Sequence, residues 1–103
     1  MTAPSTDGAA VRQIIRAVKA AGWVLSHVWD GEEETPVASE TGALALVMDL
    51  DESVLHFTKR TGPLTERGYV YFVLGNEPFE VAADYTVNLE GALAPLFDRW
   101  EDQ

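Results

Sequence analysis

Apolar residues recur at helical spacing near both ends of the chain. In the first segment they stand three and four positions apart, as one helix face requires, at Val11, Ile14, Ile15 and Val18. Asp7 is a suitable N-cap for this helix, and Gly22 is placed to end it. A second stripe predicts a C-terminal helix, capped by Asn88 and kinked by Pro95, with Leu89, Ala92, Leu93, Leu96, Phe97 and Trp100 on its apolar face.

Alternating apolar and polar residues predict strands between these helices. Residues 23–29 form the first, with one face consisting of Trp23, Leu25, His27 and Trp29. Residues 35–38 are expected at a sheet edge, because Pro36 has no N–H to donate to a neighbouring strand. Residues 54–59, 69–74 and 79–85 predict a three-stranded meander, with a loop beginning at 60–63 and a hairpin turn at 75–78. In the last strand Phe79, Val81, Ala83 and Tyr85 are expected to share a face.

The segment 40–50 is compatible with two structures. Its apolar run, Ala43–Met48, could be a buried strand paired with 23–29, but Ala, Leu and Met favour a helix. Ser39 is available as an N-cap, and Ala43, Leu44, Val47 and Met48 would then share one face. We predict a helix here.

These elements define an α+β fold. We expect an antiparallel sheet of 3–5 strands, with the N-terminal, middle and C-terminal helices packed mainly on one of its faces and the other face partly open. Residues 1–7, rich in Thr, Ser, Ala and Pro, are expected to form a flexible leader, and residues 8–103 a single domain.

Charge is the least ordinary property of the chain. Seventeen acidic residues and seven basic ones give a net charge of −10 and a pI of about 4.3. Three of the bases, Arg12, Arg16 and Lys19, fall in the first helix, so the rest of the chain is more acidic still. Such a surface repels phosphate, so direct nucleic-acid binding is not expected. A basic protein surface is the natural complement, although the acidity could also serve solubility alone.

Compartment and membrane association follow from what the sequence lacks. There are no cysteines, as is common in reducing compartments. The N-terminus has no basic start followed by an apolar core, so we expect no signal peptide. The longest apolar run, Ala43–Met48, is far shorter than the roughly 20 residues that span a membrane. We therefore expect a cytoplasmic protein that does not bind a membrane.

Two groups of residues are candidates for partner binding. Trp29 precedes an acidic turn that contains Asp30, Glu32, Glu33 and Glu34. An aromatic side chain beside carboxylates suits Arg- or Lys-rich partners through cation–π and ion-pair contacts. The second group surrounds the expected hairpin turn and consists of Glu77, Glu80 and Asp84.

Signals for catalysis are weak. The chain has no phosphate-binding glycine loop, nucleophile elbow or His-Glu-x-x-His motif. The segment Asp49–Glu52 lacks the glycine and distant glutamate of a calcium loop. We therefore expect neither an enzyme nor a cofactor or bound metal. The alternatives are a small enzyme or ligand-binding domain that uses His27, His56 or Tyr85, and a structural component of a virion.

The segment Val73–Tyr85, with the sequence VLGNEPFEVAADY, resembles a segment of small acidic phage- and prophage-encoded proteins of uncharacterised function. Those proteins carry a pattern similar to Val-Tyr-Gly-Asn, a turn, and Glu-Val-Ile-Ala-Asp-Tyr; Leu74 and Ala82 depart from it. Residues 30–33, Asp-Gly-Glu-Glu, are also similar. The resemblance implies a phage origin and a bacterial host cytoplasm, and it supports a helix at 40–50. It implies no activity.

Charge, motifs and resemblance together favour a non-enzymatic, acidic protein–protein interaction module. We expect it to bind or inhibit a host protein by contacting a basic surface of that protein. In one form of this hypothesis the carboxylates replace phosphates, so that the protein mimics nucleic acid. The oligomeric state is not indicated by the sequence.

Overall fold

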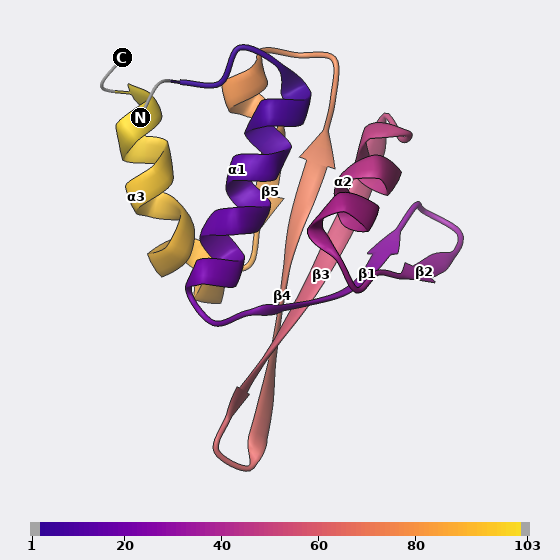
Figure 1. The fold of residues 1–103 in the computed structure, drawn as a ribbon, viewed down its shortest axis with the longest axis vertical. Coiled ribbons are helices and arrows are strands. Elements are labelled where there is room, and N and C mark those ends of the chain that lie inside the picture. The colour runs from indigo at the N-terminus through magenta and orange to yellow at the C-terminus, as the bar shows by residue number, and fades with distance from the viewer. Residues whose placement is uncertain (1–2, 102–103) are drawn as a thin grey trace.

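The computed structural model describes residues 3–101 as a five-stranded antiparallel sheet with three helices, which confirms the expected α+β class (Figure 1). The helices are α1 (Asp7–Ala20), α2 (Glu40–Met48) and α3 (Glu90–Glu101), with short 3-10 helices η1 (Pro78–Glu80) and η2 (Val87–Leu89). The strands are β1 (Val24–Trp29), β2 (Glu34–Pro36), β3 (Glu52–Thr61), β4 (Leu64–Val73) and β5 (Ala82–Tyr85). Their order across the sheet is β2-β1-β3-β4-β5.

The core lies between the helices and one face of the sheet. Figure 1 shows α1 and α2 in front of the strands, with α3 beside α1. From the sheet, the core receives the buried side chains of Leu25, Val28, Leu55, Phe57, Val70 and Phe72. From the helices it receives the expected stripes, including Ile14 and Ile15 of α1 and Leu93 and Leu96 of α3, all of them about completely buried. Burial of these apolar surfaces is the main stabilising contribution.

The first helix begins one residue earlier than expected. Thr6, not Asp7, is its N-cap, because the Thr6 hydroxyl accepts a hydrogen bond of 3.1 Å from the Ala9 N–H. The Asp7 carboxylate instead accepts from the backbone N–H of Gly75, at 3.2 Å. Gly22 follows the helix with a φ of 97°, as expected of a glycine stop. Residues 1 and 2 of the expected leader lie outside the described residues.

The segment 40–48 is the predicted helix. The Ser39 hydroxyl accepts a hydrogen bond of 3.0 Å from the Gly42 N–H, as expected of its cap. Ala43 and Val47 are buried, whereas Met48 is 39% exposed, so the expected four-residue face is narrower than predicted.

The β3–β4 hairpin is longer than the sequence indicated. Each strand has ten residues, and the expected loop at 60–63 is a tight turn around Gly62, with a φ of 62°. The ladder continues from Glu52 opposite Val73 to Thr61 opposite Leu64. This ribbon extends beyond the body of the protein (Figure 1) and accounts for its longest dimension, 41 Å.

The segment after β4 is less extended than predicted. Residues 78–80 form η1, so β5 is confined to Ala82–Tyr85, and the expected common face from Phe79 to Tyr85 is wrong. Asn88 does not cap α3: its amide Nδ2 donates to the Arg67 carbonyl at 2.8 Å, and its Oδ1 accepts from the Thr86 hydroxyl at 2.7 Å. These bonds join η2 to β4 instead.

Candidate functional site

A β-bulge in β1 determines which side chains reach the open face of the sheet, the face away from the helices. Leu25 pairs with Phe57, but the next paired residue is His27, opposite His56, so Ser26 is the extra residue. Trp23, Leu25 and Val28 therefore face the core, while His27 and Trp29 face outward. The strict alternation predicted from the sequence was wrong. It placed Trp23, Leu25, His27 and Trp29 on one face, but a bulge shifts every later side chain to the other face.

One cross-strand row on this face spans all five strands. Trp29 of β1 lies between Glu34 of β2 and Val54 of β3, and the register continues to Tyr71 of β4 and Asp84 of β5. Because directly paired residues in an antiparallel sheet point to the same side, these five side chains lie next to one another. The row thus has aromatic and apolar residues in its centre and a carboxylate at each end. We call it the open-face row.

The second row holds the two histidines. His27 and His56 stack with ring centroids 4.3 Å apart and an interplanar angle of 13°, and Tyr69 lies against His56 at 5.8 Å. The Ser26 hydroxyl is 2.9 Å from His27 Nδ1, and a carboxylate oxygen of Glu34 is 3.7 Å from His27 Nε2. Burial, followed by the neighbouring His27, lowers the pKa of His56.

The two rows enclose a shallow hollow of about 400 Å³. Its lining consists of Trp29, Val54, His56, Tyr69, Tyr71 and Asp84. Trp29 is 42% exposed, although it is among the largest apolar side chains in the protein. A hollow of this size with aromatic walls and a few polar groups is typical of a binding site.

Hydrogen bonds hold the acidic groups around the hollow in place. The Tyr71 hydroxyl donates to a Glu52 carboxylate oxygen at 2.6 Å, and this bond raises the pKa of Tyr71. The Asp30 carboxylate accepts from the backbone N–H groups of Glu32 and Glu33, both at 2.8 Å. These two bonds lower the pKa of Asp30.

In the structure, the predicted site residues form groups that differ from the two groups predicted from the sequence. Asp30, Glu32, Glu33 and Glu34 lie with Trp29 at the hairpin of β1 and β2, as their spacing implied. Asp84 joins Trp29 in the same hollow from the opposite edge of the sheet. Glu77 and Glu80 belong to the η1 region, which contacts α1, so they lie apart from Asp84's position on the open face.

Sequence reasoning missed Tyr69, Tyr71 and Val54 as site residues. Tyr69 and Tyr71 alternate with buried Val70 and Phe72, a pattern that could have placed both tyrosines on the open face. What could not be read from the sequence was the register that sets Tyr71 between Val54 and Asp84.

The alternative set of His27, His56 and Tyr85 does not form one site. The histidines share the open face, but Tyr85 pairs with buried Val70 and packs against Phe97 of α3, at 5.8 Å between ring centroids. Among residues 3–101, no cluster of three or more His, Asp or Glu side chains is arranged to hold a metal ion.

Within the same residues, no helix has the length and apolar character needed to cross a bilayer. Comparisons of the chain with protein-family models, with curated proteins and with solved structures gave no match.

Proposed function

We propose that this chain is a non-enzymatic interaction module that binds a basic segment of a partner protein on its open sheet face. The observation that carries the proposal is the open-face row: Trp29, Val54 and Tyr71 in the centre, with Glu34 and Asp84 at the ends. Aromatic rings attract Arg and Lys side chains through cation–π contacts, and carboxylates pair with the same groups.

The charge distribution supports a cationic partner. The net charge is −10, and the hollow has no Lys or Arg among the described residues that line it. Two bases elsewhere are already engaged. Arg16 makes two hydrogen bonds to Glu40, at 2.8 and 3.2 Å, and the Lys59 ammonium donates to the Ala21 carbonyl at 3.0 Å. A phosphate backbone on this face would meet carboxylates at both ends of the row, which argues against nucleic acid.

The dimensions of the row favour an extended segment. Adjacent strands are about 4.8 Å apart, so five strands place the terminal carboxylates roughly 19 Å apart along the row. An extended chain advances about 3.3 Å per residue, so about six residues cover this width. The matching segment carries basic residues near its ends and apolar residues in the middle. Because the centre of the row is aromatic and apolar, a peptide segment fits it better than a partner that reads a uniformly anionic, nucleic-acid-like surface.

The resemblance of residues 73–85 to phage-encoded proteins adds a biological setting to this proposal. In that setting the basic segment belongs to a protein of a bacterial host, and its occupation inhibits that protein.

A designed peptide tests the binding mode directly. The probe is acetyl-Arg-Gly-Leu-Leu-Gly-Arg-amide, and its control replaces both arginines with citrulline, which is neutral and similar in shape. We expect the arginine peptide to change the fluorescence of Trp29 and to bind more weakly as salt is added, because exposed charges are screened beyond about 10 Å at 0.1 M. Trp23 and Trp100 are 5% and 6% exposed and should respond little. Equal binding of the citrulline peptide would refute a cation-specific site.

Matched charge reversals separate a local site from overall acidity. The double variant Glu34→Lys/Asp84→Lys changes both ends of the open-face row, whereas Glu77→Lys/Glu80→Lys makes the same charge change in the η1 region. We expect the first to abolish binding of the arginine peptide and the second to weaken it only slightly. Equal losses would mean that the peptide responds to net charge alone, and Trp29→Ala with unchanged affinity would exclude the aromatic contact.

A further inference from the structure

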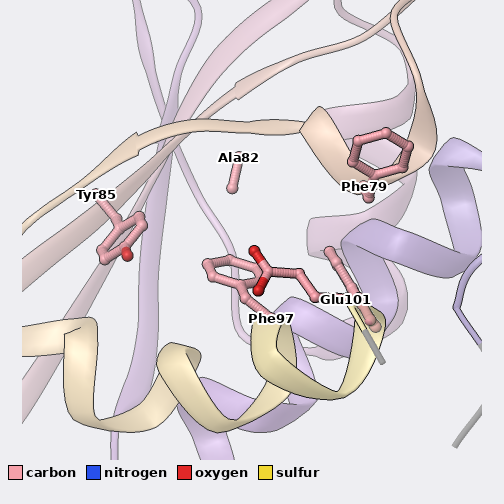
Figure 2. A pocket seen from close by; sticks show the side chains of 6 residues that line it. Phe79, Ala82, Tyr85, Phe97 and Glu101 are labelled. Carbon is pink, nitrogen blue, oxygen red and sulfur yellow. The ribbon is translucent and has the colours of Figure 1, made fainter. Parts of the chain in front are cut away.

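A second hollow, of about 430 Å³, lies on the helix side of the sheet, between η1, β5 and α3 (Figure 2). Its lining consists of Phe79, Ala82, Tyr85, Phe97, Trp100 and Glu101. Tyr85 projects away from the open face, because it pairs with buried Val70, so this pocket is distinct from the hollow that contains Tyr71. It does not depend on the function proposed for the open face.

Three of the rings form a continuous series along β5 and α3. Tyr85 and Phe97 have centroids 5.8 Å apart, and Phe97 and Trp100 have centroids 5.2 Å apart, each pair at an interplanar angle of 52°. The Trp100 indole N–H donates to the Gln13 side-chain oxygen of α1 at 2.8 Å, which fixes the ring that closes the series. The pocket wall is therefore held by contacts with two helices and a strand.

The fourth ring and a small residue leave the pocket accessible. Phe79 extends from η1 and is 56% exposed. Figure 2 shows Ala82 between Tyr85 and Phe79, where its methyl group leaves room in front of Phe97. A bound group would cover the exposed part of Phe79 as well as the Phe97 ring.

Electrostatics select the kind of group that fits. The faces of aromatic rings are negative, and the lining adds the Glu101 carboxylate, which Figure 2 shows beside Phe97. No described residue of the lining is basic. An anion would be repelled by this arrangement, and a neutral apolar molecule would gain no attraction from the carboxylate. A cation with apolar substituents satisfies both the rings and the carboxylate.

We propose that this pocket binds an alkylammonium group, of the kind carried by small organic cations with a methylated nitrogen. Several rings around one cation, with an acidic residue at the rim, form the arrangement by which proteins recognise quaternary ammonium ions. Phe79, Tyr85 and Phe97 supply the aromatic walls, and Glu101 supplies the counter-charge.

The indole N–H resonances of the three tryptophans provide an internal test by NMR. Trp100 lines this pocket, Trp29 lines the open-face hollow, and Trp23 lines neither. The probe is tetramethylammonium chloride, with sodium chloride at the same ionic strength as the salt control and tert-butanol as a neutral molecule of similar size. We expect tetramethylammonium to shift Trp100 in a saturable manner and to bind about tenfold more tightly than tert-butanol. Equal affinities, or a saturable shift at Trp29 without one at Trp100, would overturn the proposal.

Three surface variants complete the test without altering the core. Glu101→Gln removes the counter-charge, whereas Asp98→Asn removes one charge from the same helix at an exposed residue outside the lining. We expect the first to weaken tetramethylammonium binding about three- to tenfold and the second to leave it nearly unchanged. Phe79→Leu, at an exposed position, should also weaken binding. Equal effects of Glu101→Gln and Asp98→Asn would show that the pocket has no specific counter-charge and would refute the assignment.

Discussion

Replacing Gly68 of β4 by alanine should destabilise the protein, although such a replacement in a strand usually does the opposite. Alanine normally gains about 0.5–1 kcal/mol over glycine, because it has less conformational entropy to lose on folding. The backbone of Gly68 lies outside the left-handed region, so alanine meets no torsional strain. Its added Cβ would nevertheless lie 2.9 Å from Thr86 Oγ1 and 3.1 Å from both Asn88 Oδ1 and Leu89 Cδ2.

The atoms in the way cannot move freely. Thr86 Oγ1 accepts from the Tyr69 N–H at 3.1 Å and donates to Asn88 Oδ1, while Asn88 Nδ2 donates to the Arg67 carbonyl. Displacing this group loosens three hydrogen bonds, each of which contributes about 1 kcal/mol. Overpacking of this kind costs about 1–3 kcal/mol. After the entropic gain is subtracted, we expect Gly68→Ala to lower the free energy of unfolding by about 0.5–2 kcal/mol.

Urea unfolding of Gly68→Ala and Gly91→Ala measures the effect against a matched control. Gly91 of α3 is exposed, and a Cβ there meets no atom within 4 Å, so Gly91→Ala should gain about 0.5–1 kcal/mol. In Gly68→Ala/Thr86→Ala the closest contact is removed, so the double variant should lose less stability than the two single variants combined. A Gly68→Ala protein as stable as Gly91→Ala would refute the steric argument.

Two further predictions concern the core and pH. Ile14→Ala and Phe72→Ala, each 0% exposed in the native protein, should lower the free energy of unfolding by about 2–5 kcal/mol in urea titrations, and a loss near zero at either would contradict its burial. The pKa of His56 is lower in the folded protein than its ordinary value near 6.5, so the unfolded chain binds more protons between these two values. The contribution of neutral His56 to stability should therefore be fully present above about pH 6.5 and be lost as the pH falls through the folded-state pKa. His56→Gln should reduce this decline in stability. An equal decline in the variant would assign it to other groups.

The helices could be predicted because their signals are local. The apolar spacing in residues 11–18, the cap at Ser39 and the stripe from Leu89 to Trp100 each depend on residues within a few turns of one another. The edge position of Pro36 is similarly local, since it follows from the missing N–H. These features identified the α+β class before any tertiary contact was known.

The errors arose where distant pairing decides the structure. No residue near Ser26 indicates a bulge, because the extra residue is defined only by how β1 pairs with β3. Residues 60–68 are polar and contain Gly62 and Pro63, which indicate a loop by composition, yet the β3–β4 ladder continues through them. In residues 78–80, the turn at Pro78 continues as η1 where alternation suggested a strand.

The candidate site was half predictable for the same reason. Trp29 and its acidic neighbours are adjacent in the sequence, so their clustering could be expected. The contribution of Tyr71 and Asp84 depends on the order of strands in the sheet, and no local sequence pattern indicates that order. The sequence therefore indicated one end of the open-face row, and the register placed the other.

The extended ribbon of β3 and β4 is the part of the molecule whose strand edges are most accessible to a second copy of the chain. Both outer strands are short, with three residues in β2, including a proline, and four in β5. Pairing with β1 ends at Thr58, and pairing with β5 ends at Val70, so between these positions and the turn the outer sides of the two strands have no neighbouring strand. Thr86 and Asn88 bond to Tyr69 and Arg67 at the start of this stretch of β4. Arg60, Glu66 and Arg67 are exposed there, and charged side chains on such edges hinder the stacking of one chain's ribbon onto another's. In this part of the chain, polar composition protects against aggregation, which explains why a well-formed hairpin has the composition of a loop.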